Sequence, residues 1–202
     1  MAAAAVHDER SPRRRLLDAG LELFGTVGYE ATTISDLCRE ARVSTRDFYR
    51  HAGDRIDLFL ALFEQEVERV IGPVTAALDR SPPVWEVRAR IWTEQWLQTM
   101  VADARRYRVL YTEAIGVSPA LEGRRREVLR SNCRLCARHL ALCDEARGER
   151  RPPGHYDAAG VAIMGAAREL LLQYMEGALG IGAPGAVGDA VVHLGMLVGE
   201  GW

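Results

Sequence analysis

The chain has 202 residues, of which 48% are hydrophobic and 27% charged, and its formal net charge at pH 7 is −2. This composition predicts a folded globular protein, with room for one large domain or for a small domain joined to a larger one. No apolar run reaches the roughly 18 residues that a membrane helix needs, so we expect a cytoplasmic protein with no membrane partner. The near-neutral charge gives no overall support for nucleic-acid binding, so such a function would depend on where the charges lie.

Three short helical patterns open the chain. Apolar residues recur at spacings of one, three and four over residues 13–24, which predicts an amphipathic helix facing a core, and the glycines that follow end it. A second helix is expected to start at Thr32 or Thr33, because Asp36 follows Thr33 by three residues, as in a weak capping box. Ser44 is the expected N-cap of a third helix, which runs to about residue 51.

Residues 31–55 therefore place two short helices on either side of a turn of a few residues, in the sequence ATTISDLCREARVSTRDFYRHAGDR. This arrangement is typical of a helix-turn-helix that reads DNA. Residues 1–55 hold nine arginines and nine acidic residues, so a basic surface requires that the fold sorts these charges in space. Arg46, Arg50 and Arg55 in the second half of the segment indicate such sorting.

The remainder of the chain is predicted to be helical throughout. Asp54 is the expected N-cap of a long helix, and Ser118 followed by Pro119 predicts the start of another that continues to about Ala146. The last two helices are expected at about residues 155–179 and 186–200. Breaks are expected at Gly72-Pro73, Ser81-Pro82-Pro83, 116–119, 151–154 and 180–188, the last of them a flexible loop.

A stripe of tryptophans marks the middle of the chain. Trp85, Trp92 and Trp96 are seven and four residues apart, which places them within about 40° on one helix face. Such a face suits the wall of a pocket for a small, largely apolar molecule, although ordinary core packing explains it equally well. The candidate pocket residues are Trp92, Gln95, Trp96, Thr99, Met100, Tyr107, Tyr111 and Tyr174.

The last two helices are apolar almost all round, so they must be covered on more than one side. The simplest cover is the same pair of helices from a second subunit, and burial inside one monomer is the alternative. A twofold dimer would hold two DNA-reading helices about 34–36 Å apart, which suits a palindromic site. The candidate interface residues are Ala158, Ala162, Gly165, Leu172, Val191, Leu194 and Val198.

A metal or thiol sensor is an alternative that the cysteines raise. Cys136, His139 and Cys143 fall within about 60° of one another on a helix, and such soft ligands can bind zinc or copper(I). Apolar residues border the same face, however, and a buried cysteine behaves as a small hydrophobe. The four cysteines are also too few for a disulfide scaffold, so we interpret them as reduced thiols and predict no metal and no cofactor.

Residues 13–63 resemble the signature of the TetR family of one-component transcriptional regulators. The resemblance rests on the long first helix, the Gly-Tyr turn, the Thr-Thr-Ile opening of the second helix, Ala41 and Val43 around the turn, and Phe48-Tyr49. It implies an all-α fold in which a three-helix helix-turn-helix DNA-binding domain, residues 9–53, is joined to a larger helical domain, residues 54–202, for effector binding and dimerisation. Beyond residue 63, the likeness is limited to a helical outline.

The resemblance also implies roles for single residues. Thr32 or Thr33, together with Tyr49, would contact backbone phosphates, and Arg55 corresponds to the basic residue that opens the fourth helix. Arg46 is the first candidate for a guanine contact, and Asp47 either accepts from a cytosine amino group or stabilises its own helix. The full set of DNA-binding candidates is Thr32, Thr33, Ser44, Thr45, Arg46, Asp47, Tyr49, Arg50, His51 and Arg55, where His51 suits packing or a phosphate contact equally.

We therefore expect a homodimeric regulator that binds double-stranded operator DNA and responds to a small apolar effector, most often as a repressor by resemblance to the family. Effector binding beside the tryptophan stripe would move the helix that begins at Asp54 and change the spacing of the DNA-reading helices. We do not expect an enzyme, because the sequence contains no catalytic triad order, phosphate loop or nucleotide-binding turn. A dimeric helical adaptor remains the alternative, although it would not need the motif at residues 31–55.

Overall fold

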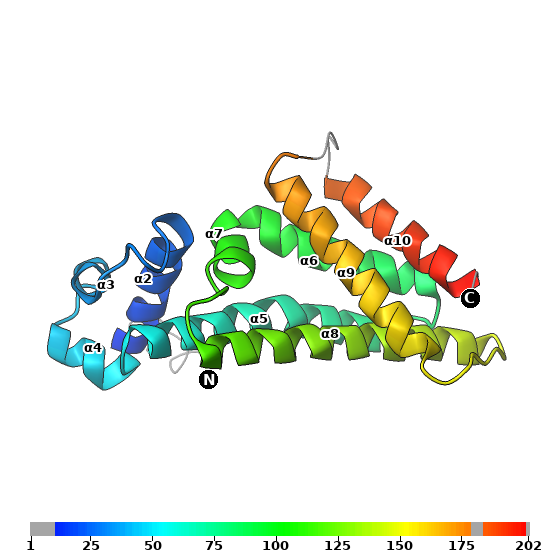
Figure 1. Ribbon diagram of the computed structural model, residues 1–202, viewed down its shortest axis with the longest axis horizontal. Coiled ribbons are helices and arrows are strands. Elements are labelled where there is room, and N and C mark those ends of the chain that lie inside the picture. Colours follow the sequence, from blue (N-terminus) through cyan, green and yellow to red (C-terminus); the bar gives the residue numbers. More distant parts are fainter. Residues whose placement is uncertain (1–10, 179–183, 201–202) are drawn as a thin grey trace. The chain divides into compact units, whose positions relative to one another are not determined.

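The computed structural model describes residues 11–178 and 184–200, without the side chains of residue 184 and residues 198–200. Over this part of the chain the structure is helical and has no strand, which confirms the predicted all-α fold. The elements are α2 (Pro12–Thr26), α3 (Ile34–Ala41), α4 (Thr45–Ala52), α5 (Arg55–Asp79), α6 (Trp85–Ala102), α7 (Ala104–Tyr107), the π-helical η1 (Arg108–Thr112), α8 (Pro119–Ala146), α9 (His155–Met175) and α10 (Pro184–Glu200) (Figure 1). Among these described helices, none combines the length and the apolar character needed to span a membrane.

The chain folds into two compact units. The first unit consists of Met1–Arg69 and Ala102–Arg125, and the second consists of Val70–Val101 and Arg126–Trp202. Helices α5 and α8 contribute residues to both units. This grouping differs from the predicted boundary at residue 53, because α7, η1 and the start of α8 belong to the first unit. That residues 9–53 form a domain of their own stays a prediction.

Polar side chains start the helices where the sequence predicted. The hydroxyl of Thr33 accepts the backbone N–H of Asp36 at 3.1 Å, and the carboxylate of Asp36 accepts the backbone N–H of Thr33 at 3.1 Å, so α3 begins with a complete capping box. Ser44 caps α4 by accepting the backbone N–H of Asp47 at 3.1 Å. Ser118 caps α8 in the same way, and α8 ends at the predicted residue. These caps fix where the short helices of the first unit begin.

Aromatic rings form the centre of the first unit. Phe24 of α2 and Phe59 of α5 are both 0% exposed and meet edge to face, with ring centroids 5.0 Å apart. Tyr29 packs against both rings, at 5.5 Å and 5.2 Å. Leu37 of α3 and Phe48 of α4 are also completely buried. Each such side chain stabilises the fold by about 1.5–3 kcal/mol, so this core holds α2, α3, α4 and the start of α5 together (Figure 1).

Helix α5 continues through Gly72 and Pro73, so the predicted break at this point was wrong. Proline has no backbone N–H and disfavours a helix interior. The apolar face of α5 nevertheless continues across it, because Val70, Val74 and Leu78 are at most 4% exposed. Burial of this face outweighs the local preference of the two helix breakers.

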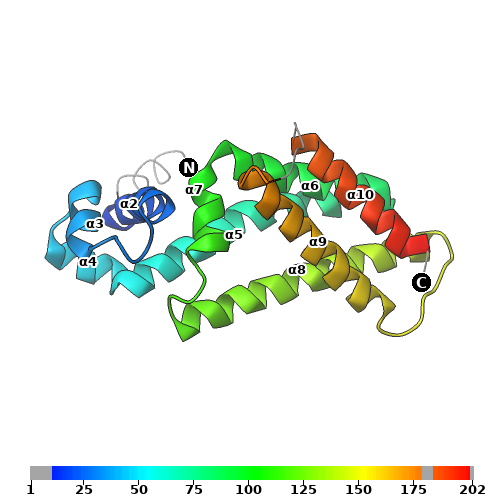
Figure 2. The ribbon, with the colours of Figure 1, turned by 45° about the horizontal axis from the view of Figure 1, so that its top comes forward.

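Helices α9 and α10 lie side by side in the second unit (Figure 2). Helix α9 approaches α8 closely at Gly160, where a β-carbon would lie 2.5 Å from the carbonyl oxygen of Cys133. Helix α9 ends at Met175, before the predicted residue 179, and α10 begins at Pro184, before the predicted residue 186. Of the loop predicted at 180–188, residues 184–188 are therefore helical, and residues 180–183 lie outside the described part of the chain.

Candidate functional site

Helix α4 presents polar side chains on one face and a buried ring on the other. Phe48 is 0% exposed, whereas Tyr49 is 55% exposed. The other exposed residues of this face and of its N-cap are Ser44, Thr45, Arg46 and Arg50. Arg46 makes no hydrogen bond or ion pair with any residue that the structure describes, so its guanidinium can form new bonds. The predicted DNA-reading face is therefore exposed and is backed by the core of the first unit.

The turn between α3 and α4 consists of residues 42–44. Arg42 ends α3 in the left-handed conformation, with φ of 52°, and no other non-glycine residue in the described ranges has a positive φ. The backbone N–H of Val43 donates to the carbonyl of Cys38 at 3.0 Å. The guanidinium of Arg15 donates to the carbonyl of Arg42 at 3.4 Å. These contacts hold the two helices at the angle that exposes α4.

Asp47 stabilises the start of its own helix. The hydroxyl of Ser44 donates to the carboxylate of Asp47 at 2.7 Å, and this hydrogen bond lowers the pKa of Asp47. A guanidinium nitrogen of Arg50 lies 3.8 Å from the same carboxylate. The geometry favours the interpretation of Asp47 as a helix-start residue, and its contact with a base stays a prediction.

The two threonines before α3 differ in exposure. Thr32 is 1% exposed, and its hydroxyl donates to the carbonyl of Gly28 at 2.7 Å, so it serves the fold. Thr33 is exposed at the N-terminus of α3, where backbone N–H groups and the helix dipole favour an anion. Of the two alternatives, Thr33 is the exposed one, and its contact with a phosphate stays a prediction.

Arg55 and His51 also take part in contacts within the first unit. The guanidinium of Arg55 lies 4.2 Å from the centroid of the Tyr29 ring and donates to the carbonyls of Thr32 at 2.7 Å and Tyr29 at 3.3 Å. His51 is half-buried, and its backbone carbonyl accepts from Arg13 at 3.0 Å. Arg55 thus holds the loop between α2 and α3, and a phosphate contact by either residue stays a prediction.

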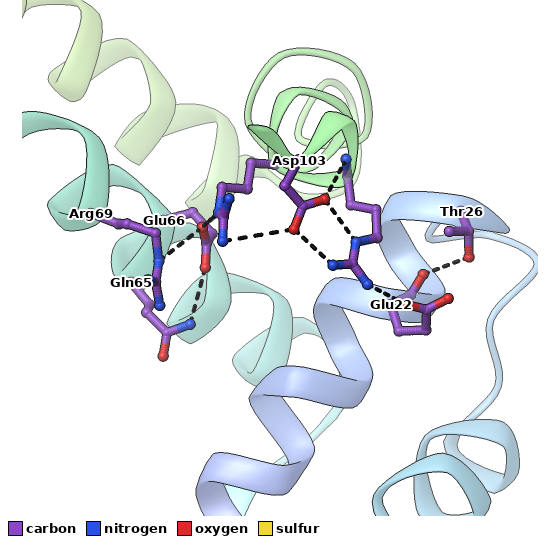
Figure 3. Close-up of polar contacts among 8 residues, drawn as sticks. Glu22, Thr26, Gln65, Glu66, Arg69 and Asp103 are labelled. Atoms are coloured by element: carbon purple, nitrogen blue, oxygen red, sulfur yellow. Dashed lines mark hydrogen bonds and ion pairs between the residues drawn. The ribbon is translucent and has the colours of Figure 1, made fainter. Parts of the chain in front are cut away.

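Helix α5 contains a buried carboxylate that was not among the predicted site residues. Glu66 of α5 is 0% exposed, and its carboxylate accepts from the Nε of Arg106 at 2.9 Å and from the amide of Gln65 at 3.1 Å. The Nε of Arg69 lies 3.5 Å away (Figure 3). The available signal was an acid in the apolar stripe of a helix, since Glu66 follows Phe63 by three residues.

This carboxylate belongs to a chain of ion pairs that joins three helices of the first unit. Asp103, the N-cap of α7, accepts from Arg105 at 2.7 Å and lies 3.7 Å from Arg106, and the hydrogen bonds from Arg105 hold the pKa of Asp103 below its usual range. Arg105 also pairs with Glu22 of α2 (Figure 3). We call these residues the polar bridge: Glu22, Gln65, Glu66, Arg69, Asp103, Arg105 and Arg106. The polar bridge links α2 to α5 and α7.

A second contact ties the loop between α2 and α3 to the segment after α7. The carboxylate of Glu113 accepts the backbone N–H of Tyr29 at 2.9 Å and a guanidinium N–H of Arg108 at 2.8 Å. Arg108 also donates to the carbonyl of Thr26. Gly28, with φ of 100°, allows the loop to turn beside this carboxylate. Helix α2 and the loop that follows it are thus anchored at two points to residues 103–113.

The predicted pocket residues divide between the two units. Trp92 and Trp96 stack with ring centroids 5.3 Å apart, and Trp96 and Met100 are at most 4% exposed. Gln95, Thr99 and Tyr174 are half-buried in the second unit. Tyr107 and Tyr111 stack at 5.9 Å in the first unit. Of the tryptophan stripe, Trp96 therefore packs as core, whereas Trp85 and Trp92 are half-buried, and the role of the stripe as a pocket wall stays a prediction.

Cavities of the second unit lie beside other residues. One cavity of about 200 Å³ is lined by Trp85, Leu140, Asp144, His155, Tyr156 and Met196, among others. A smaller one of about 20 Å³ is lined by Trp85, Arg88, Trp92, Cys136, His139 and Val191, among others. Trp85 borders both cavities, and Trp92 is the predicted pocket residue that reaches the smaller one. Arg88 and His139 are 51 residues apart in sequence, so no local pattern could pair them.

The metal-sensor alternative is disfavoured by these contacts. A guanidinium nitrogen of Arg88 lies 2.6 Å from the Nδ1 of His139, and its charge repels a metal ion. Burial raises the pKa of the Cys136 thiol to about 12 and also raises the pKa of Cys143, whereas a metal needs thiolates. Among the residues that the structure describes, no group of three metal-ligating side chains comes together.

The residues predicted to form the dimer interface differ in exposure. Ala158, Ala162 and Gly165 are exposed on α9, together with Val161, which is 59% exposed. Leu172 and Leu194 are half-buried, and the side chain of Val198 lies outside the described part of the chain. Val191 was wrongly assigned to the interface, because it is 1% exposed and lines the smaller cavity within its own chain. The exposed candidates therefore lie on one face of α9.

Comparisons with known proteins agree with this geometry. The family model described as bacterial regulatory proteins, tetR family, matches residues 16–62. The HTH-type transcriptional regulator HbdR of an Aromatoleum species (strain CIB) is 35% identical over 101 residues, which is 46% of this chain and 40% of that protein. The HTH-type transcriptional activator FasR of Mycolicibacterium smegmatis is 30% identical over 104 residues, which is 52% of this chain and 46% of that protein. The match thus spans less than half the length of these curated relatives.

The fold is shared over almost the whole chain. The crystal structure of the transcriptional regulator FadR from Bacillus subtilis in complex with stearoyl-CoA superposes with a TM-score of 0.79 at 16% sequence identity, over 93% of this chain and 98% of that chain. At this identity the likeness concerns the fold. The segment that matches the family model is the one that forms α2, α3, α4 and the first part of α5. Residues 16–62 of the chain therefore match the tetR family of bacterial regulatory proteins, and the fold of the chain is shared with the FadR structure.

Proposed function

We propose that this chain is a transcription regulator that binds double-stranded operator DNA through α4 and responds to a small molecule. The observation that carries the proposal is the exposed face of α4, on which Arg46 has no partner among the described residues while Phe48 anchors the helix in the core. A helix-turn-helix lays its second helix in the major groove, where an arginine can donate two hydrogen bonds to a guanine. Thr33 and Tyr49 hold the helix in place through phosphates.

The chain binds its operator as a homodimer through α9. The exposed small residues Ala158, Ala162 and Gly165, beside the exposed Val161, support this, because small side chains let two helices approach closely and apolar area favours burial. A twofold axis then sets two copies of α4 about 34–36 Å apart, the repeat of the major groove. The operator is accordingly palindromic.

The effector binds in the second unit and releases the DNA, so that the regulator acts as a repressor. Two continuous stretches of chain carry the change: α5, and the junction of α6 with α7 at Asp103. Each of these two stretches contributes residues to the polar bridge. The polar bridge connects them to α2, the first of the proposed DNA-binding helices. The effector needs to favour the released spacing of the two α4 helices by a few kcal/mol, about 1–3 kcal/mol being typical of allosteric coupling.

Selection of bound sequences from random duplex DNA, followed by fluorescence anisotropy on single-base variants of the recovered site, tests the DNA-binding assignment. Arg46→Ala is expected to weaken binding by about 5- to 150-fold, equivalent to about 1–3 kcal/mol, and to relax specificity at one position of each half-site. Tyr49→Phe is expected to weaken binding evenly across sequences, because it removes a phosphate contact.

Arg130→Ala is the matched control, since it removes the same charge from an exposed position on α8 of the second unit. This variant is expected to keep full operator affinity. Retention of full affinity and specificity by both Arg46→Ala and Tyr49→Phe would refute the assignment of α4.

A further inference from the structure

A buried arginine lies beside the smaller cavity of the second unit. Arg88 of α6 is 7% exposed, and its guanidinium donates to the carbonyls of Ser81 at 3.0 Å and Pro82 at 2.9 Å and to the Nδ1 of His139 at 2.6 Å. Within the described part of the chain, no carboxylate forms an ion pair with it. A buried cation without a counter-charge is costly, so this guanidinium favours a negatively charged group beside it.

The neighbouring histidine carries a ring N–H that no described residue accepts. Because a guanidinium only donates, the Nδ1 of His139 must accept, and the ring hydrogen is therefore on Nε2. Burial, reinforced by the charge of Arg88, lowers the pKa of His139 to about 4, so the ring is neutral near pH 7. His139 is 3% exposed, and its buried Nε2 has no partner among the residues that the structure describes. A buried donor of this kind calls for an acceptor.

A second donor without an acceptor belongs to the same cavity. The indole Nε1 of Trp85 is also buried and has no partner in the described part of the chain, and both Trp85 and His139 line the smaller cavity. Its volume of about 20 Å³ suits a single oxygen-sized group. Trp85 also forms a wall of the larger cavity of about 200 Å³, where Val84, Leu140 and Met196 provide apolar surface.

We propose that these two cavities bind a small organic acid with an apolar body. One carboxylate oxygen accepts the N–H groups of His139 and Trp85 and supplies the counter-charge of Arg88, and the apolar body occupies the larger cavity. Asp144 in the larger cavity does not oppose this, because its own charge is balanced by Arg147 and Arg151. The inference rests on the proposed function, since it names the chemical class of the effector. The expected effector, a small apolar molecule, becomes a small apolar molecule that carries a carboxylate.

Calorimetric titration of the full chain with acids and with their neutral amides tests this inference. The probes are phenylacetate against phenylacetamide and hexanoate against hexanamide, which share skeletons and differ in charge. We expect each acid to bind at least about tenfold more tightly than its amide, because hydrogen bonds to a charged acceptor are the stronger ones. Equal affinities of acid and amide, or no binding of either acid at millimolar concentration, would overturn the inference.

Variants locate the bound carboxylate. His139→Phe removes the Nε2–H and keeps a ring of similar size, and we expect it to lower the affinity for phenylacetate by about tenfold or more. His193→Phe makes the same change on the exposed side of α10 and is expected to have no effect. Should His139→Phe fail to fold, Trp85→Phe tests the other donor, with the same loss expected. Full retention of phenylacetate affinity in a folded variant of either kind would place the acid elsewhere and overturn the site.

A single ordered water is the competing occupant, because one oxygen can accept from both N–H groups. A crystal structure grown with phenylacetate decides between them, and a water left in the smaller cavity with the acid absent overturns the inference. Anisotropy with the selected DNA, measured on the same samples, separates the two proposals. A chain that binds this DNA but does not prefer acids contradicts the inference alone, whereas one that prefers acids but binds no DNA contradicts the proposed function.

Discussion

Replacing Glu66 by glutamine removes one charge from the polar bridge without changing the size of the side chain. The carboxylate of Glu66 is 0% exposed and balances Arg106, which is 18% exposed with its Nε at 2.9 Å. After the change, the nearest acid to Arg106 is Asp103 at 3.7 Å. Breaking a buried pair by removing one partner costs about 3–5 kcal/mol, and because Arg106 retains Asp103 we expect the lower end, about 3 kcal/mol.

Thermal unfolding followed by circular dichroism measures this loss. For a chain of this size, about 3 kcal/mol corresponds to a fall in Tm of about 6–12 °C. Glu64→Gln is the matched control, because it makes the same change two positions before Glu66 on α5. Glu64 pairs with Arg124, but its side chain is 40% exposed. An exposed pair of this kind contributes about 0–1 kcal/mol. Equal losses of stability in the two variants would refute the reasoning that burial makes Glu66 important.

Four further changes test other parts of the structure. Thr33→Ala should lower the free energy of unfolding in urea by about 1 kcal/mol through loss of the α3 cap, whereas Thr33→Ser should not; equal losses would contradict the role of the hydroxyl. Arg42→Gly should raise the free energy of unfolding by about 1 kcal/mol, since glycine adopts the left-handed conformation without strain, and no gain would speak against strain at this residue. The pKa of His139 is about 4 in the folded chain and ordinarily 6.5. As the pH falls, His139 therefore takes up a proton in the unfolded chain before it does so in the folded chain. The contribution of neutral His139 to the free energy of unfolding is therefore complete above about pH 6.5, and about 3 kcal/mol of it is lost as the pH falls towards 4. Urea unfolding at several pH values in this range should show this loss, and His139→Phe should reduce the pH dependence of the unfolding free energy. Val161→Arg should abolish the proposed homodimer and give a monomer in sedimentation velocity, and a dimer that persists would place the interface elsewhere.

The features that local chemistry decides could be predicted from the sequence. The capping box of Thr33 and the cap provided by Ser44 each depend on residues within a few positions of one another, and the structure confirms both. The all-α fold followed for the same reason, because helix periodicity is a local signal.

The features that tertiary packing decides could not be predicted. Pro73 predicted a break, but burial of the neighbouring face keeps α5 helical. Val191 lies in a helix that is apolar on most sides, so periodicity could not say which side faces its own chain. The pair of Arg88 and His139 and the polar bridge around Glu66 join distant positions, and a single sequence carries no signal for such pairing.

The proline inside α5 makes this helix easier to bend at one point, although the helix is continuous there. Pro73 has no N–H to donate to the carbonyl four residues earlier, which is that of Arg69, the last residue of the first compact unit in this helix. A helix that lacks one hydrogen bond bends more easily there than elsewhere along its length. If the proposed effector acts in the second unit, α5 therefore offers a defined place at which it can bend, and we expect Pro73→Ala to make the helix stiffer there.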